Sequence, residues 1–187
     1  ERTGRPLPAD ERARVLDRLQ AQSAEFGDLV TELVVLARDE RELARERLDV
    51  AQVVDRAVRR ARSRAHDHVF DVDRESWSIV GNAAALERSV LNLLDNAAKF
   101  SPAGSTVTVR SASGWLTVTD EGPGLPAEHR RQAFDRFWRA PDARGLPGSG
   151  LGLAIVADTV ATLGGTARFT PSPTGRGASV RIELPPA

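Results

Sequence analysis

The order in which strand and helix patterns follow one another between residues 48 and 187 most constrains the fold. After an opening helix, the order is strand, strand, helix, strand, strand, a long loop, helix, strand and strand. This series predicts an α+β fold, a two-layer sandwich in which helices cover one face of a mixed sheet. Apolar residues at helical spacing predict helices over 50–64, 83–99 and 151–163. Alternating or short apolar runs predict strands over 68–73, 76–80, 105–112, 115–120, 166–171 and 178–184.

A separate long helix is predicted before this series, over residues 10–39. Asp10 is a suitable N-cap for it. Residues spaced by three and four form a heptad seam along it: Leu16, Leu19, Ser23, Phe26, Val30, Leu33 and Ala37. The seam fits either an amphipathic helix that lies on its own domain or a helix that pairs with others in a bundle across a dimer. We therefore expect two parts, residues 1–47 with this helix and residues 48–187 with the sandwich.

Composition excludes several classes of function. The 187 residues include 26 basic and 26 acidic ones, and this zero net charge gives no support for nucleic-acid binding. The absence of cysteine excludes disulfides, thiolate metal sites and a cysteine nucleophile. No apolar run is long enough to cross a bilayer, so no membrane contact is expected. Because the chain contains no methionine, we do not expect residue 1 to be a translation start, and we expect a piece of a longer protein.

The helix expected over 83–99 carries a polar stripe. Asn92, Asn96 and Lys99 recur on one side of it, opposite the apolar face. Such a stripe is often only a solvated surface. Asparagine, however, is a poor helix former, and Lys99 is the only lysine among the 26 basic residues. Amide oxygens can ligate Mg²⁺ and an ammonium group can contact phosphate, so the stripe is a candidate site for both.

Glycines mark two further candidate segments. Asp120 ends a strand on its inward face, and Gly122 and Gly124 follow it. A carboxylate in that place needs a donor, either a backbone N–H or the amine of a purine. Residues 147–156, PGSGLGLAIV, place alternating glycines before an apolar helix. The N–H groups of such a loop can cradle phosphate, although the run can also be a simple joint.

The segment between these glycines, residues 121–150, is long for a connection inside a compact domain. A length of this kind is typical of a lid or a binding loop. We expect a short helical stretch over 128–140, from which Phe134, Phe137 and Trp138 can anchor the loop to the body. For Phe134, simple packing is the favoured interpretation.

Four segments together resemble the motifs of bacterial sensor histidine kinases. NLLDNAAKFSP, DEGPGLP, FDRFWR and GSGLGLAIV follow one another in the order and at the spacing of that family's N, G1, F and G2 boxes. The closing GGTARF and GRGASVRIELP resemble its last glycine-containing box and final strands. The resemblance covers about residues 48–187 and extends to actinobacterial membrane-bound kinases of the envelope-stress and persistence type. It implies the histidine-kinase ATPase fold of the GHKL superfamily.

This resemblance implies a site for ATP and Mg²⁺. Asn96 would coordinate Mg²⁺, and Asn92 would support the nucleotide site. Lys99 would contact phosphate, Phe100 would pack against adenine, and Asp120 would accept a hydrogen bond from the adenine amino group. The other residues implied in ATP binding are Gly122 and Gly124 near the base, Arg139 toward the γ-phosphate, the hinge and phosphate residues Gly148, Ser149, Gly150, Leu151 and Gly152, and Ser179 near the base.

The resemblance also implies a function with one part missing. The helix over 10–39 resembles the second helix of the family's dimerisation and phosphotransfer hairpin, but no block like HELRTPL, which holds the phosphoacceptor histidine, is present. We therefore expect the ATP-binding catalytic part of a two-component protein histidine kinase that does not phosphorylate itself alone. The expected partners are a response regulator, whose aspartate receives the phosphoryl group, and a second copy through the dimerisation helices. The expected location is cytoplasmic, with the parent anchored in the cell membrane.

Two alternatives to this function remain open. The first is another ATPase of the same superfamily, such as an anti-sigma-factor serine kinase, a gyrase-type ATPase or a mismatch-repair ATPase. The GSGLGLAIV and FDRFWR segments, with a heptad helix upstream, argue against the last two. The second alternative is a non-catalytic scaffold module that binds nucleotide without transfer.

Overall fold

A computed structural model describes residues 45–143, 146 and 148–187. The helix predicted over 10–39 lies outside these residues, and the division into 1–47 and 48–187 remains a prediction. The helices are α2 (Val50–Arg62), α3 (Ala83–Phe100) and α4 (Gly152–Thr162). The strands are β1 (Glu46–Asp49), β2 (Val69–Arg74), β3 (Ser78–Gly81), β4 (Thr106–Ala112), β5 (Trp115–Thr119), β6 (Thr166–Thr170) and β7 (Ser179–Glu183).

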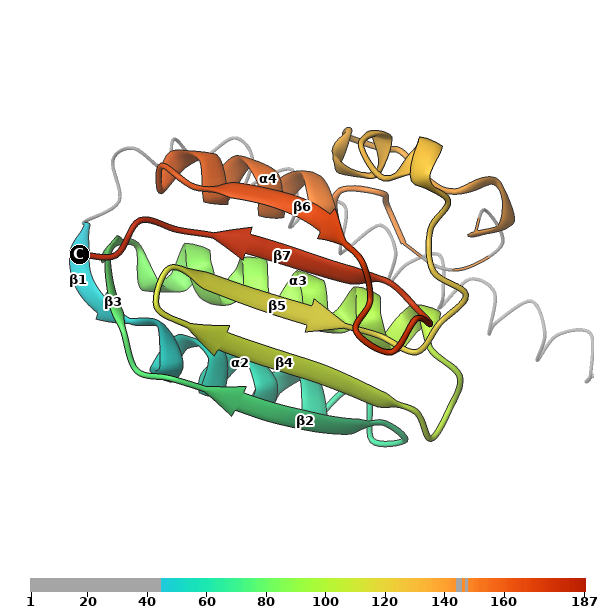
Figure 1. Ribbon diagram of the computed structural model, residues 1–187, viewed down its shortest axis with the longest axis horizontal. Helices are drawn as coiled ribbons and strands as arrows, with labels where there is room; N and C mark the ends of the chain where they lie inside the picture. The colour runs from blue at the N-terminus through green and yellow to red at the C-terminus, as the bar shows by residue number, and fades with distance from the viewer. Residues whose placement is uncertain (1–44, 144–145, 147) are drawn as a thin grey trace, which may run out of the picture.

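Five of the strands form one mixed sheet in the order β2-β4-β5-β7-β6 (Figure 1). The β2–β4 pair is parallel, and the other three pairs are antiparallel. Val118 at the centre lies between Val109 and Val180 in register. The predicted α+β class and mixed sheet are therefore confirmed.

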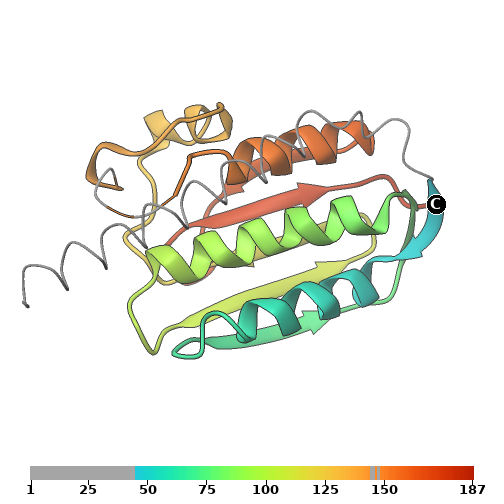
Figure 2. The ribbon, with the colours of Figure 1, turned by 180° about the vertical axis from the view of Figure 1, so that it is seen from behind.

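All three helices cover the same face of this sheet, as the two opposite views show (Figures 1 and 2). The core lies between the two layers, because each central strand turns alternate side chains toward the helices. The most deeply buried side chains of the strands are Val107, Val109, Leu116 and Ile182. On the helices they are Val50, Val54, Ala57, Leu86, Val90, Leu94, Val156 and Val160. This arrangement confirms the predicted two-layer sandwich.

The helices begin where the sequence supplies caps. The Asp49 carboxylate accepts a hydrogen bond from the N–H of Ala51 at the start of α2. The Asn82 side chain accepts from the N–H of Ala85 at the start of α3. Each cap satisfies a backbone donor that the first helical turn leaves without a partner.

A small second sheet was not predicted. β1 pairs antiparallel with β3, so the strand expected at 76–80 leaves the main sheet. The N–H of Val50 donates to the carbonyl of Trp77, and the N–H of Ala187 donates to the carbonyl of Ser78. This sheet ties the first described residues and the C-terminal residue to the same end of the sandwich (Figure 1).

The loop after β5 differs from the expected helical stretch over 128–140. It contains three short 3-10 turns, Ala127–His129, Gln132–Phe134 and Pro141–Ala143. Phe134 packs edge-to-face on Phe169, as expected from simple packing. The side chain of Phe137 does not anchor the loop, because the residue is 59% exposed, and its backbone has a φ of 63°. That left-handed backbone conformation interrupts any continuous helix.

None of the described helices is both long and apolar enough to cross a membrane.

Candidate nucleotide-binding site

Asp120 is held at the end of β5 as a buried acceptor. Its Oδ1 accepts hydrogen bonds from the N–H groups of Gly122 at 2.8 Å and Ala178 at 2.9 Å. Among the residues that the structure describes, none donates a hydrogen bond to Oδ2. Burial raises the pKa of this carboxyl, and the bonds from Ala178 and Gly122 offset only part of that rise. The carboxylate therefore has one oxygen held by the backbone and one oxygen available for an outside donor.

Two glycines make this arrangement of Asp120 possible. A Cβ at position 122 would overlap the carbonyl oxygen of Phe100, and a Cβ at position 177 would overlap the carbonyl oxygen of Asp120. Gly177 also has a φ of +71°, which side chains disfavour. The chain thus passes close to Asp120 on both sides, from the loop after β5 and from the turn before β7.

The asparagine stripe of α3 faces the start of α4 rather than open solvent. Asn92 Nδ2 donates to the carbonyl of Gly152 at 3.4 Å. Asn96 Nδ2 lies 3.5 Å from the place that a Cβ of residue 152 would take. Both amides are half-buried there, and α3 and α4 run side by side (Figure 2). Gly152 therefore lets the first turn of α4 approach these two amides.

The C-terminal end of α3 contacts the glycine run from the other side. Lys99 Nζ lies 2.8 Å from the place of a Cβ at Gly148, where φ is +129°. The same ammonium lies 4.8 Å from the ring centroid of Phe100. Lys99, Phe100 and the glycine run are therefore neighbours.

Close backbone contacts also hold the two ends of the long loop. The N–H of Phe137 donates to the carbonyl of Gly150 at 3.1 Å, and a Cβ on Gly150 would lie 2.8 Å from the carbonyl oxygen of Trp138. Leu151 is fully buried, and its N–H donates to Ser149 Oγ at 3.2 Å. The buried side chain of Leu151 anchors the glycine run to the sandwich just before α4. At the other end of the loop, a Cβ on Gly124 would lie 2.9 Å from the carbonyl oxygen of Gly177.

Two predicted site residues have contacts elsewhere. Arg139 Nη2 donates to the carbonyls of Ala143 and Leu146, so its guanidinium holds the loop. Ser179 is buried, and its Oγ accepts from Thr119 Oγ1 at 2.9 Å and from Thr170 Oγ1 at 3.1 Å. Thr119, Thr170 and Ser179 alternate along their strands with residues that face the core, so their hydroxyls lie on the other face of the sheet. No hydrogen bond among the described residues joins the side chain of Arg139 or Ser179 to that of Asp120 or Asn96.

Sequence reasoning missed Gly177 and Ala178 as parts of the site. Their backbone holds Asp120, although they follow it by 57 and 58 residues. The GRG sequence at 175–177 was the available signal, because alternating glycines indicate a tight turn.

The described residues include no cluster of three His, Cys, Asp or Glu side chains that could hold a metal ion alone. A cation at this site therefore requires other ligands, such as the amide oxygen of Asn96 together with the oxygens of a phosphate ligand. The paired amides, the ammonium of Lys99 and the backbone N–H groups beside Gly152 fit a phosphate chain with a hard cation.

Comparison with known proteins decides the family. Residues 81–187 match the family described as histidine kinase-, DNA gyrase B-, and HSP90-like ATPase. A solved structure of the mycobacterial sensor histidine kinase MprB aligns with a TM-score of 0.69 and 41% identity, covering 76% of this chain and 98% of that chain. The chain belongs to the sensor histidine kinases. This confirms the family that the four motifs predicted.

The curated relatives are longer than this chain. MprB of Mycolicibacterium smegmatis, named a signal transduction histidine-protein kinase/phosphatase, is 46% identical over 189 residues, covering 96% of this chain and 38% of the relative. The Mycobacterium tuberculosis protein of the same name is 44% identical, covering 96% of this chain and 37% of the relative. Full-length ShkA, solved with AMPPNP, aligns with a TM-score of 0.72 and 27% identity, covering 98% of this chain and 40% of ShkA. The chain thus spans less than two fifths of the length of these curated relatives.

Proposed function

We propose that this chain binds ATP with Mg²⁺ and supplies the nucleotide site of a two-component histidine kinase. The observation that carries the proposal is the state of Asp120. Its Oδ1 is saturated by two backbone N–H groups, and Oδ2 accepts no hydrogen bond from the described residues. A buried carboxylate oxygen held in this way is an acceptor for the exocyclic amine of adenine.

The remaining residues fit a purine on one side and a phosphate chain on the other. Phe100 offers a half-exposed ring for the base. Gly122 lets the loop after β5 pass close to the backbone of Phe100, and Gly124 lets it pass close to Gly177. Asn96 would ligate Mg²⁺ and Lys99 would contact phosphate. The other residues that we assign to ATP are Asn92, Gly148, Ser149, Gly150, Leu151 and Gly152, with Arg139 and Ser179 placed there by the family resemblance alone.

The chemistry asks mainly for position and charge neutralisation. Phosphoryl transfer has a loose transition state, so holding the γ-phosphoryl group in line and balancing its charge does most of the work. The ammonium of Lys99 and the N–H groups of the glycine run supply that charge complement from this chain. Bound Mg²⁺ would add charge neutralisation between the phosphates. The accepting histidine belongs to a separate helix, because no HELRTPL-like block is present here.

The relatives' names extend the proposal to the parent protein. MprB is named a histidine-protein kinase/phosphatase, and we propose that the parent of this chain likewise phosphorylates a histidine. A response regulator would then take the phosphoryl group on an aspartate, and a second copy would pair through the helix predicted over 10–39.

Ligand-dependent melting tests the nucleotide site. At a hundred times its dissociation constant, Mg-ATP should stabilise the fold by about 2.7 kcal/mol. At roughly 2–4 °C per kcal/mol for a chain of this size, the melting temperature should rise by roughly 5–11 °C. Asp120→Asn should abolish most of the shift, because the new NH₂ group cannot accept from adenine.

Asn96→Ala serves as a second variant with a different signature. It should chiefly remove the Mg²⁺ dependence of the melting shift, and the variant should still bind nucleotide in the absence of the metal. Melting shifts that are unchanged in both variants would refute the assignment of this site.

A further inference from the structure

The outward side of α2 carries an excess of positive charge. From Arg56 to Arg64 this segment holds five arginines and no acidic residue. We use the name basic face for a set of seven residues. Five are arginines, namely Arg56, Arg59, Arg60, Arg64 and Arg88 of α3, and two are the α3 carboxylates Glu87 and Asp95.

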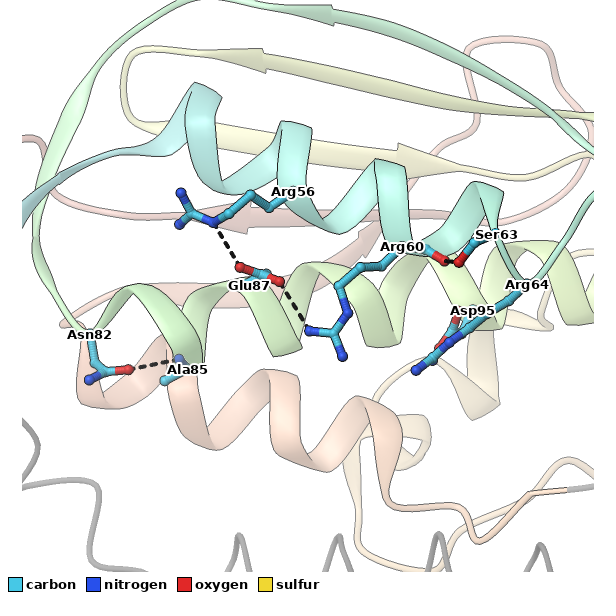
Figure 3. A network of polar contacts seen from close by, with 8 residues as sticks. All are labelled: Arg56, Arg60, Ser63, Arg64, Asn82, Ala85, Glu87 and Asp95. Atoms are coloured by element: carbon cyan, nitrogen blue, oxygen red, sulfur yellow. Dashed lines mark hydrogen bonds and ion pairs between the residues drawn. The ribbon is translucent and has the colours of Figure 1, made fainter.

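Carboxylates of α3 neutralise only part of this face (Figure 3). Glu87 receives both Arg56 Nε at 2.8 Å and Arg60 Nη1 at 3.0 Å, and Arg64 Nη1 reaches Asp95 at 2.9 Å. Arg59 and Arg88 form no ion pair with any described residue. Five guanidiniums against two carboxylates leave a net charge of +3 on the basic face of a chain whose total charge is zero.

The complementary charge lies upstream in the same chain. Residues 19–37 contain no basic residue, and their acidic residues are Glu25, Asp28 and Glu32. These positions step by three and four, so on the helix predicted over 10–39 they form one stripe. At 100° per residue the stripe lies opposite the heptad seam, which leaves the apolar side for other contacts.

We propose that the acidic stripe of residues 19–37 docks on the basic face of α2 in the same molecule. The three carboxylates match the net charge of +3. Residues 38–45 connect the two parts and span up to about 26 Å when extended, at about 3.3 Å per residue. That reach allows the stripe to fold back antiparallel to α2, with Glu32 toward the start of α2 and Glu25 toward its end.

Docking at this face leaves the nucleotide residues uncovered. α2 and α4 lie on opposite sides of α3 (Figure 2), and the amides of Asn92 and Asn96 face α4. The proposal therefore does not rest on nucleotide binding, and its test needs no nucleotide.

Energy transfer between two dyes measures the docking directly. The chain has no cysteine, so Gln22→Cys with Ser63→Cys gives two unique labelling sites, one on each proposed partner. Transfer should be high at 0.01 M salt and fall about twofold or more at 1 M, as the Debye length shrinks from about 30 Å to about 3 Å. Transfer that does not change with salt would overturn the proposal.

Charge reversal supplies the decisive comparison. Arg59→Glu with Arg88→Glu should lower the transfer at low salt to its high-salt value. The matched control, Arg131→Glu with Arg176→Glu, changes two exposed arginines of the lid and of the turn before β7, and it should leave the transfer unchanged. Reversal of the stripe, Glu25→Arg, Asp28→Arg and Glu32→Arg, should also abolish transfer, and combining it with Arg59→Glu and Arg88→Glu should restore it.

Two further results would overturn the proposal. Reversed variants that keep full transfer would show that these charges do not hold the segment. Transfer that arises on mixing donor-only and acceptor-only chains would assign the contact to a second copy. Cooperative thermal unfolding of each variant, measured alongside, confirms that the sandwich remains folded.

Discussion

At the scale of single residues, Asp120 is under two opposing influences. Burial raises the pKa of its carboxyl by penalising the charged form, whereas hydrogen bonds from the N–H groups of Ala178 and Gly122 favour that form. The effect of burial is the larger, so the pKa of Asp120 is raised and its charged form lowers the free energy of unfolding. This cost keeps a hydrogen-bond acceptor in a buried position. Such a cost is typical of residues that serve a ligand rather than the fold.

This cost predicts a pH dependence of stability. Because the pKa of Asp120 is higher in the folded chain than the usual 3.8, the folded state binds more protons in the window above 3.8. The contribution of this group to the free energy of unfolding therefore falls as pH rises through that window. Asp120→Asn keeps an oxygen for both N–H groups and does not titrate, so its stability relative to wild type should increase from about pH 4 upward. Urea unfolding at several pH values measures this, and parallel curves for the two proteins would contradict it.

Substitutions at the two glycines of the GRG turn, Gly175 and Gly177, test how closely the backbone holds Asp120. Gly175→Ala should cost about 1–2 kcal/mol, the ordinary penalty for a left-handed residue, because nothing lies within 4 Å of its Cβ position. Gly177→Ala should cost clearly more, because its Cβ would overlap the Asp120 carbonyl oxygen. It should also weaken ATP binding. Denaturant unfolding and nucleotide titration of both variants measure the difference, and equal effects would show that the backbone yields at Gly177.

At the scale of elements, α2 and α3 are joined by more than apolar packing. Glu87 is largely buried and lies between Arg56 and Arg60 of α2 (Figure 3). Burial alone would raise its pKa, but the hydrogen bonds from the two arginines outweigh burial and lower it. The two ion pairs of Glu87 therefore stabilise the contact between α2 and α3 when the carboxylate is charged.

Glu87→Gln should therefore lower stability at neutral pH by about 1 kcal/mol, because it removes a carboxylate shared by two partly exposed arginines. The pKa of Glu87 is depressed below its usual 4.5, so this contribution is present above that pH and is lost as pH falls through the folded value. The control Asp158→Asn breaks the exposed pair with Arg136 and should change stability by less than about 0.5 kcal/mol. Unfolding at neutral and acidic pH tests both, and equal losses in the two variants would contradict a special role for Glu87.

At the scale of the whole molecule, the sandwich holds the proposed nucleotide site, and none of the histidines in the given sequence matches the family's acceptor motif. The three histidines are His66, His68 and His129, and none lies in an HELRTPL-like block. Under the proposed function, a separate helix would present the accepting histidine at the end of the site where Lys99 lies beside the glycine run.

This division of parts predicts activity only in combination. The chain incubated with radiolabelled ATP should form no phosphohistidine by itself, because it supplies position and charge but no accepting imidazole. Adding a separate fragment that carries the family's acceptor helix should produce acid-labile phosphate on that fragment. A competent acceptor that stays unlabelled, with nucleotide binding intact, would favour a module that binds ATP without transferring phosphate.

Local patterns predicted most elements to within a few residues, because hydrophobic periodicity and caps act over one or two helical turns. The exceptions involve partners that are distant along the chain. The pairing of β1 with β3 was missed, because a four-residue strand has too little periodicity to stand out. The short helical stretch expected over 128–140 is present only as two 3-10 turns that end at Phe134, and Phe137, whose N–H donates to the carbonyl of Gly150, has a left-handed backbone.

The sequence by itself determined the fold class, the family and the chemical types in the site, since each is written in local spacing and in motif order. Only the tertiary structure decided which of these residues meet. Gly177 and Ala178 lie against Asp120, and Asn92 and Asn96 face α4. Arg139 donates hydrogen bonds to carbonyls of the loop. The physical reason is that such contacts depend on strand register and on helix packing between segments far apart in the chain, which no local pattern specifies.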